Sequence, residues 1–373
     1  MSLLQLKNVS MHFVKKGKFL EAEKQIKVLR NVNLEIEQGE IVVLVGESGC
    51  GKTTIGKIIT GLLRPTKGDI IFNGNNIYKF SLFGKRQKIS VDESLLQEKT
   101  DKERKKFVKE YTRSQKEEAK KQIAEYENSV QFVQQDSYAA LNPARTIFQS
   151  LYAPIQNKHR SWSKEQVNDR IEEVMSLVGL VPSEQFLFKF PHQLSGGQRQ
   201  RVLMARAISL DPKLIVADEP VSMIDVSLRL SILDLMKKLN SQLNIAFVYI
   251  THDLSTARYI GQNGRICIMY LGEIVEMGKV TDVIASPKHP YTQALFSAVP
   301  VPDPTIARKR REIKLKSMDV GNLLQRKDGC PFYARCLYSH EDCENKAMDF
   351  TVTDNVCVKC DYIAEVPKWQ TDI

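Results

Sequence analysis

A complete phosphate-binding loop near the start of this chain constrains its fold more than any other feature. The loop, Gly46-Glu47-Ser48-Gly49-Cys50-Gly51-Lys52-Thr53, follows an apolar run over 41–45 and precedes a helical stretch over 53–63. Strand, loop and helix in this order are the context in which such a motif binds nucleotide phosphates, whereas a glycine-rich turn without a ligand is the alternative. The sequence therefore predicts parallel buried strands alternating with helices around a bound nucleotide.

Each residue type in the loop has a physical task. Glycines let the backbone curl so that its amides converge on phosphate oxygens, and the helix start adds a partial positive charge. We expect Lys52 to neutralise the β- and γ-phosphates and the Thr53 hydroxyl to contact Mg²⁺. The residues expected to bind the nucleotide here are Gly46, Ser48, Gly49, Cys50, Gly51, Lys52, Thr53 and Thr54.

Two further apolar runs end in polar residues that suit hydrolysis. The run 214–216 leads into Asp218 and Glu219, and the run 245–250 leads to His252. Adjacent carboxylates at a strand end are costly unless they face a cation or a reacting water. We expect Asp218 to contact Mg²⁺, Glu219 to polarise the attacking water as general base, and His252 to align the γ-phosphate with Glu219.

A fourth motif lies about twenty residues before Asp218. The segment 195–201, Ser-Gly-Gly-Gln-Arg-Gln-Arg, resembles the signature of ABC ATPases. It offers a hydroxyl and glycine amides to an anion at a helix start. In that family the anion is the γ-phosphate of ATP bound to the other subunit, so the resemblance implies a head-to-tail dimer. The residues that would reach ATP in this way are Ser195, Gly196, Gly197 and Gln198.

The resemblance implies three more site residues. Gln135 resembles the Q-loop glutamine, which contacts Mg²⁺ and senses the membrane partner. Asp225 resembles the D-loop aspartate. Phe13 resembles the aromatic residue that stacks on adenine, with a residue of a strand core as the alternative. On this pattern Gln135 joins Glu219 and His252 as catalytic residues.

Finer matches point to one branch of the family. The segments 135–143 and 289–295 resemble the ATPases of oligopeptide and dipeptide permeases, and 218–222 is similar to the second of their two ATPase subunits. The resemblance implies an ATP-hydrolysing motor of a peptide importer, peripheral on the cytoplasmic face of the membrane. Its expected partners are a sister ATPase subunit, two transmembrane permease subunits and an extracytoplasmic substrate-binding protein, and no nucleic acid.

Several alternatives stay open from the sequence. A soluble ABC ATPase acting on ribosomes or DNA is one, and a non-hydrolysing subunit is another. The cargo alternatives are an oligosaccharide or a nickel complex, and the dimer partner is a second copy or a sister subunit. The net charge of +10 permits contact with nucleic acid or an anionic membrane surface without establishing either. No apolar run reaches the roughly 18 residues of a membrane span.

The family implies a RecA-like core, an antiparallel β layer near the N-terminus and a helical subdomain. We place the ABC ATPase domain at 1–285, with the helical subdomain at about 136–210 and a charged insert at about 83–128. From Lys85 onward the insert has no Gly or Pro, so we expect one or two exposed helices. A solvated excursion, a regulatory or partner-docking role, and disorder are the alternatives for it. Residues 286–373 form a small Cys-rich C-terminal extension.

Five of the seven cysteines lie in this extension: Cys330, Cys336, Cys343, Cys357 and Cys360. Clustered thiols in a cytosolic chain bind a metal or a cluster more often than they form disulfides. Residues 329–336 resemble the motif of the permease ATPases in which four cysteines hold a [4Fe-4S] cluster. That resemblance implies Cys330, Cys336 and Cys343 as ligands with Cys360 as the fourth and Cys357 as its rival. Zn²⁺ or free thiols are the alternatives.

Overall fold

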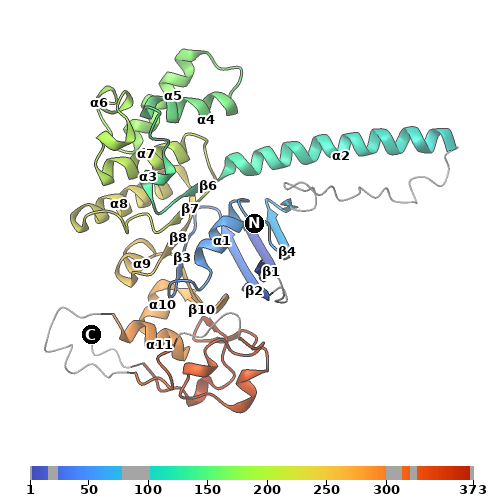
Figure 1. Ribbon diagram of the computed structural model, residues 1–373, viewed down its shortest axis with the longest axis vertical. Coiled ribbons are helices and arrows are strands. Elements are labelled where there is room, and N and C mark those ends of the chain that lie inside the picture. Colours follow the sequence, from blue (N-terminus) through green and yellow to red (C-terminus); the bar gives the residue numbers. More distant parts are fainter. Residues whose placement is uncertain (1, 16–23, 78–100, 300–312, 320–325, 370–373) are drawn as a thin grey trace.

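The computed structural model describes residues 2–15, 24–77, 101–299, 313–319 and 326–369 (Figure 1). Two sheets form its centre, and helices cover the larger one. Residues 83–100 of the expected insert lie outside the described residues. Among the described residues, no helix combines the length and the apolar character that crossing a membrane requires.

The larger sheet has eight strands, of which five run parallel. In spatial order they are β11 (Thr351–Thr353), β12 (Val356–Val358), β10 (Glu273–Lys279), β9 (Arg265–Tyr270), β3 (Ile41–Val45), β8 (Ala246–Thr251), β7 (Leu214–Asp218) and β6 (Val130–Val133). The parallel strands are β9, β3, β8, β7 and β6. All residues of β7 and β8 are buried, because helices cover both faces of a parallel sheet.

Two apolar clusters lie on the two faces of this sheet. On one face, α1 (Lys52–Ile59) contributes Ile55 and Ile58 to a cluster with Val42 and Val216. The other face carries α8 (Val226–Leu243), α9 (Leu254–Ile260), α10 (Val280–Ala285) and α11 (Pro290–Ser297). The sheet is thus held between helices, as the predicted α/β core requires.

The smaller sheet is antiparallel and packs beside α1. Its strands are β2 (Lys24–Glu37), β1 (Ser2–Lys15), β4 (Lys67–Phe72) and β5 (Asn75–Asn76), in that order. The buried side chains of these strands share a cluster with α1. This sheet confirms the antiparallel β layer expected near the N-terminus.

A group of helices follows β6 and lies apart from the smaller sheet (Figure 1). They are α3 (Ser137–Ala140), α4 (Ile147–Lys158), α5 (Lys164–Leu177), α6 (Glu184–Leu187), the 3₁₀ helix η3 (Pro191–Gln193) and α7 (Gly196–Ile208). Three of the starts are fixed by capping boxes, in which a Ser or Thr and a Gln three residues later satisfy each other's backbone amides. We call this group the helical subdomain.

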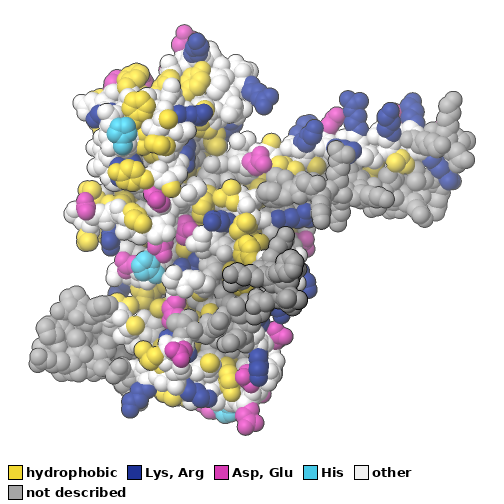
Figure 2. Space-filling view, viewed as in Figure 1, with side chains coloured by type: hydrophobic (Ala, Val, Ile, Leu, Met, Phe, Trp, Pro, Cys, Tyr) yellow, Lys and Arg dark blue, Asp and Glu magenta, His cyan; other side chains and the backbone are white. Residues whose placement is uncertain are grey.

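The insert forms one long helix, α2 (Asp101–Ser129), that projects from the body (Figure 1). Lys and Arg side chains stand out along it (Figure 2). Its C-terminal part is anchored to the body, because the Tyr126 hydroxyl donates to the Ile59 carbonyl and the Tyr126 ring meets Phe72 edge-on at 5.2 Å. Within the described residues the insert is therefore a single helix.

The C-terminal extension is built from short elements that join the core. Its 3₁₀ helices are η4 (Tyr333–Arg335), η5 (Glu341–Glu344) and η6 (Ile363–Glu365). Strand β12 pairs with β10, with Val358 opposite Glu276 and Cys357 opposite Met277. The extension therefore continues the core sheet.

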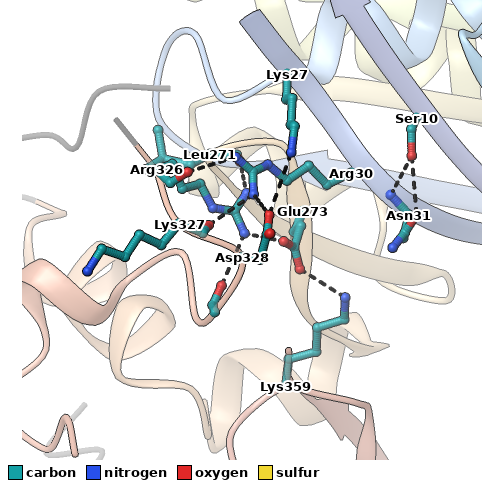
Figure 3. A network of polar contacts seen from close by, with 11 residues as sticks. Ser10, Lys27, Arg30, Asn31, Leu271, Glu273, Arg326, Lys327, Asp328 and Lys359 are labelled. Carbon is teal, nitrogen blue, oxygen red and sulfur yellow. Dashed lines mark hydrogen bonds and ion pairs between the residues drawn. The ribbon is translucent and has the colours of Figure 1, made fainter. Parts of the chain in front are cut away.

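Ion pairs add to this junction (Figure 3). Arg30 donates to Asp328 at 2.9 Å, and Lys359 lies 3.1 Å from Glu273. Arg326, almost fully buried, also pairs with Glu273. Charges from the extension thus meet partners on β2 and β10.

Candidate active site

The phosphate loop connects β3 to α1, as the sequence predicts. Gly49 and Gly51 have φ of +80° and +108°, a region that side chains with a Cβ rarely adopt. A Cβ on Gly46 would lie 2.2 Å from the Met269 carbonyl oxygen. The loop conformation therefore depends on glycine at these three positions.

Lys52, Thr53 and Asp218 meet at the base of the loop. The Lys52 ammonium donates to the carbonyls of Gly46 at 2.7 Å and Glu47 at 3.0 Å, so it is held within the curve of the loop. Burial raises the pKa of Asp218, at the end of β7, while a hydrogen bond from the Thr53 hydroxyl works in the opposite direction. A hydroxyl and a carboxylate side by side are the oxygen ligands that Mg²⁺ prefers.

Gln135, Glu219 and His252 come together through their side chains. The Gln135 amide donates to one Glu219 carboxylate oxygen at 3.1 Å, and Nδ1 of His252 lies 2.8 Å from the other. These residues follow β6, β7 and β8, whose parallel pairing brings their carboxyl ends to one edge of the sheet. Glu219 is thus oriented from both sides, as a general base for water needs to be.

The other predicted site residues lie away from this cluster. Ser195 caps α7 through its hydroxyl, which accepts from the Gln198 amide at 3.3 Å, and α7 and α1 belong to different parts of the molecule (Figure 1). Asp225 precedes α8 and is exposed. Phe13 on β1 is 40% exposed, as a ring that stacks on a base has to be.

An exposed group of apolar side chains lies beside the signature segment. It consists of Met223, Val226, Leu228 and Leu230, and we call it the apolar patch. A Cβ on Gly197 would lie 3.3 Å from Leu228, and one on Gly196 would lie 3.6 Å from the Met223 carbonyl. Exposed apolar side chains beside a functional segment are candidates for contact with another molecule.

Four of the five C-terminal cysteines line one small cavity: Cys330, Cys336, Cys343 and Cys360. Cys357 lies in β12 and is not among the described residues that line it. Burial raises the pKa of Cys330 to about 12 and that of Cys336 to about 11. In the described part of the chain, no group of three or more His, Cys, Asp or Glu side chains is arranged to hold a metal ion. The arrangement of the thiols therefore does not by itself support the expected iron–sulfur centre.

Comparison with protein families decides the classification. The family model described as ABC transporter matches residues 29–222, more than half of the 373 residues. The chain belongs to the ABC transporter family. A second model, described as the C-terminal region of oligopeptide/dipeptide transporters, matches residues 275–343 and places this ABC transporter chain in that branch.

Individual relatives agree with this assignment. The oligopeptide transport ATP-binding protein AppF of Bacillus subtilis is 34% identical, over 94% of this chain and 93% of its own. The dipeptide transport ATP-binding protein DppF of Escherichia coli is 37% identical, over 90% and 86%. The solved dimer of MJ0796, a bacterial ABC transporter cassette, has a TM-score of 0.56 and 29% identity, covering 74% of this chain and 98% of that one. The chain is therefore an ATPase with the ABC nucleotide-binding fold.

The sequence analysis missed the role of Glu47 in the loop of this ABC ATPase and the two residues that the structure brings to it, Arg335 and Tyr291. Glu47 is held by Arg335 through two contacts of 2.9 and 3.1 Å, and its amide donates to the Tyr291 hydroxyl at 3.0 Å. Arg335 and Tyr291 belong to the C-terminal extension. The sequence does show an acidic residue in the loop, Glu47, and a basic residue in the 329–336 motif, Arg335. Their positions along the chain do not indicate that the two side chains form an ion pair.

Proposed function

We propose that this ABC ATPase is the motor of an importer for oligopeptides or dipeptides. The observation that carries the motor role is the placement of Glu219 between Gln135 and His252, beside the end of the strand that supplies Asp218. The peptide cargo is supported by the names of the relatives and by the match to the C-terminal region of oligopeptide/dipeptide transporters.

In this proposal each site residue keeps its expected role. Lys52 and the loop amides bind the phosphates of ATP, and Phe13 stacks on adenine. Thr53, Asp218 and Gln135 would hold Mg²⁺. Glu219 activates the water, and the hydrogen bond from the Gln135 amide keeps its carboxylate aimed at the γ-phosphate. The domain division at 285 and 286 belongs to the same proposal.

The signature segment then acts on ATP held by a sister ATPase subunit in a head-to-tail dimer. Two observations support this: the apolar patch is exposed next to Ser195–Gln198, and the MJ0796 cassette is described as a dimer. Two transmembrane permease subunits and an extracytoplasmic binding protein complete the importer. The chain would sit peripherally on the cytoplasmic face of the membrane.

The test is to purify the chain from its membrane under anaerobic conditions and to measure ATPase activity in the assembled complex. We expect two permease subunits and a second ATPase to co-purify, and peptide-loaded binding protein to stimulate ATP hydrolysis. Lys52→Ala should abolish the stimulation by removing phosphate binding, whereas Lys164→Ala, an exposed lysine in α5, should not. Recovery with ribosomal or DNA-processing proteins and without permease would contradict the importer.

We also propose that Cys330, Cys336, Cys343 and Cys360 hold a [4Fe-4S] cluster. The support is the donor set and not its present arrangement: four thiols line one cavity, the number that ligates such a cluster, and bound iron would favour their thiolate forms. The cluster would tie the extension together. Anaerobic iron and sulfide analysis should give about four of each per chain. Cys360→Ser should lower that content and Cys357→Ser should not, whereas stoichiometric zinc without sulfide would contradict the cluster.

A further inference from the structure

The C-terminal extension reaches the phosphate loop directly. Arg335 Nη1 lies 2.9 Å and 3.1 Å from the two carboxylate oxygens of Glu47. The Tyr291 hydroxyl accepts a hydrogen bond from the Glu47 amide at 3.0 Å. Both the side chain and the backbone of one loop residue are therefore held by groups that lie 244 and 288 residues further along the chain.

The Arg335 side chain is fixed by its own surroundings. It is 9% exposed and lies 5.7 Å from the ring of Tyr270 and 5.6 Å from that of Phe332, with the Tyr270 hydroxyl at 3.3 Å from Nη1. Phe332 is buried against Tyr270 and Tyr291. Because packing limits where the guanidinium can go, Glu47 is held in one place rather than in a mobile surface pair.

Glu47 needs such a partner because of where it lies. It is the residue after Gly46 in a loop whose task is to attract phosphate oxygens, and a free carboxylate there repels a polyphosphate. Arg335 offsets this charge, because its guanidinium contacts both carboxylate oxygens of Glu47. The Lys52 ammonium meanwhile donates to the backbone carbonyl of Glu47 at 3.0 Å and to that of Gly46 at 2.7 Å.

We propose that the C-terminal extension sets the ATP affinity of the core through Arg335, which positions and neutralises Glu47 of the phosphate loop. The inference rests on the proposed role of this loop in ATP binding. Arg335 is a positioning residue: it acts on the nucleotide only through Glu47. Since Cys336 follows it directly, any group that fills the thiol cavity is one residue away from this contact.

The experiment is calorimetric titration of the purified full-length chain with ATP and with AMP. Arg335→Gln should weaken ATP binding about tenfold, the size expected when a charged hydrogen-bonded group loses its partner, and Arg335→Lys should weaken it less. AMP, with one phosphate, should be affected least. Arg335→Gln combined with Glu47→Gln should recover most of the ATP affinity, because no unpaired charge then remains in the loop.

The matched control is Arg326→Gln. Arg326 is as buried as Arg335 and joins the same extension to Glu273 on β10 (Figure 3). The hydrogen-bond partners of its side chain among the described residues are Leu271, Glu273 and Gly329, which lie outside the loop. We expect it to leave ATP affinity within about twofold of the unaltered chain, because coupling between separated groups is small. Should Arg335→Gln fail to fold, Glu47→Gln alone still tests the charge and should bind ATP at least as tightly as the unaltered chain.

Three outcomes would overturn the proposal. These are unchanged ATP affinity in Arg335→Gln, equal weakening of ATP and AMP, and a double variant that binds ATP as poorly as Arg335→Gln. Because titration needs neither permease nor peptide, these results are independent of the cargo. Failure of peptide stimulation in the assembled complex would contradict the importer and leave the Arg335 result standing.

Discussion

Glu219 has a backbone conformation that residues with a side chain seldom adopt, with φ of +46°. Its amide donates to the Ile250 carbonyl at 2.9 Å, so the strand pairing of β7 with β8 continues into this turn. Such strain costs about 1–3 kcal/mol and persists where the surroundings enforce it. In Glu219 this backbone conformation directs the carboxylate toward Gln135 and His252. The preceding residue, Asp218, faces the Thr53 hydroxyl instead.

Glu219→Gln should separate binding of ATP from its hydrolysis. The amide keeps the size of the side chain but cannot take a proton from water, so we expect ATP affinity within about threefold and hydrolysis reduced at least about 100-fold. Steady-state phosphate release and equilibrium ATP binding measure the two quantities. Glu172→Gln, at an exposed position of α5, is the control. Near-normal hydrolysis in Glu219→Gln would exclude Glu219 as the base.

The junction between β10 and α11 depends on two buried titratable groups. Glu276 is fully buried in β10 and accepts the amides of Lys288 and His289 at 2.8 Å each. His289 caps α11, because its Nδ1 accepts the Tyr291 amide at 3.0 Å. This cap requires an unprotonated Nδ1, and burial lowers the pKa of His289 to about 3.

His289 therefore predicts a loss of stability in acid. Between pH 6.5, the ordinary value, and about 3, the unfolded chain binds a proton that the folded chain does not, so stability falls as the pH falls. From pH 7.5 to 5.5 the unaltered protein should lose about 1 kcal/mol more than His289→Asn, which keeps the cap without titrating. Urea unfolding at the two pH values measures the difference. The exposed His192→Asn should follow the unaltered protein, and an identical pH response in His289→Asn would contradict this role.

The sequence was sufficient to predict the position of those candidate site residues that directly follow an apolar strand. The loop, Asp218, Glu219 and His252 each follow an apolar run, so parallel strands necessarily bring them to one edge. The pairing of Arg335 with Glu47 was not predictable, because it spans 288 residues and depends on how the extension packs. The register of β12 on β10 likewise depends on tertiary packing. For the insert, composition predicted one or two exposed helices, and it could not decide between them. The described part forms one helix.

The C-terminal extension and the core of the molecule share one sheet. The order β12-β10-β9-β3 links the Cys-rich segment by strand pairing to the strand that enters the phosphate loop. Phe332 is buried in the same apolar cluster as Tyr270 of β9 and Tyr291 of α11. Separate unfolding of the extension would therefore break both a strand pair and a buried cluster.

Hydrogen exchange tests this shared stability. We expect amides of 351–358 that are bonded in the sheet to open together with those of 273–279, because both belong to one cooperative unit. The solvent-facing part of α2, over 103–118, should open at a lower free energy. Mass spectrometry of proteolytic peptides after timed exchange measures all three. Early exchange of 351–358, well before 273–279, would show that the extension opens on its own.

Continuous strand pairing also gives the extension a practical use. Val352 on β11 is 72% exposed, far along the sheet from the nucleotide site. Each strand from β11 to β3 is hydrogen-bonded to the next. A fluorescent probe attached at Val352 would therefore change its orientation together with β3. The fluorescence anisotropy of such a probe would report the orientation of β3, which enters the phosphate loop, during ATP turnover. The loop itself would stay unmodified.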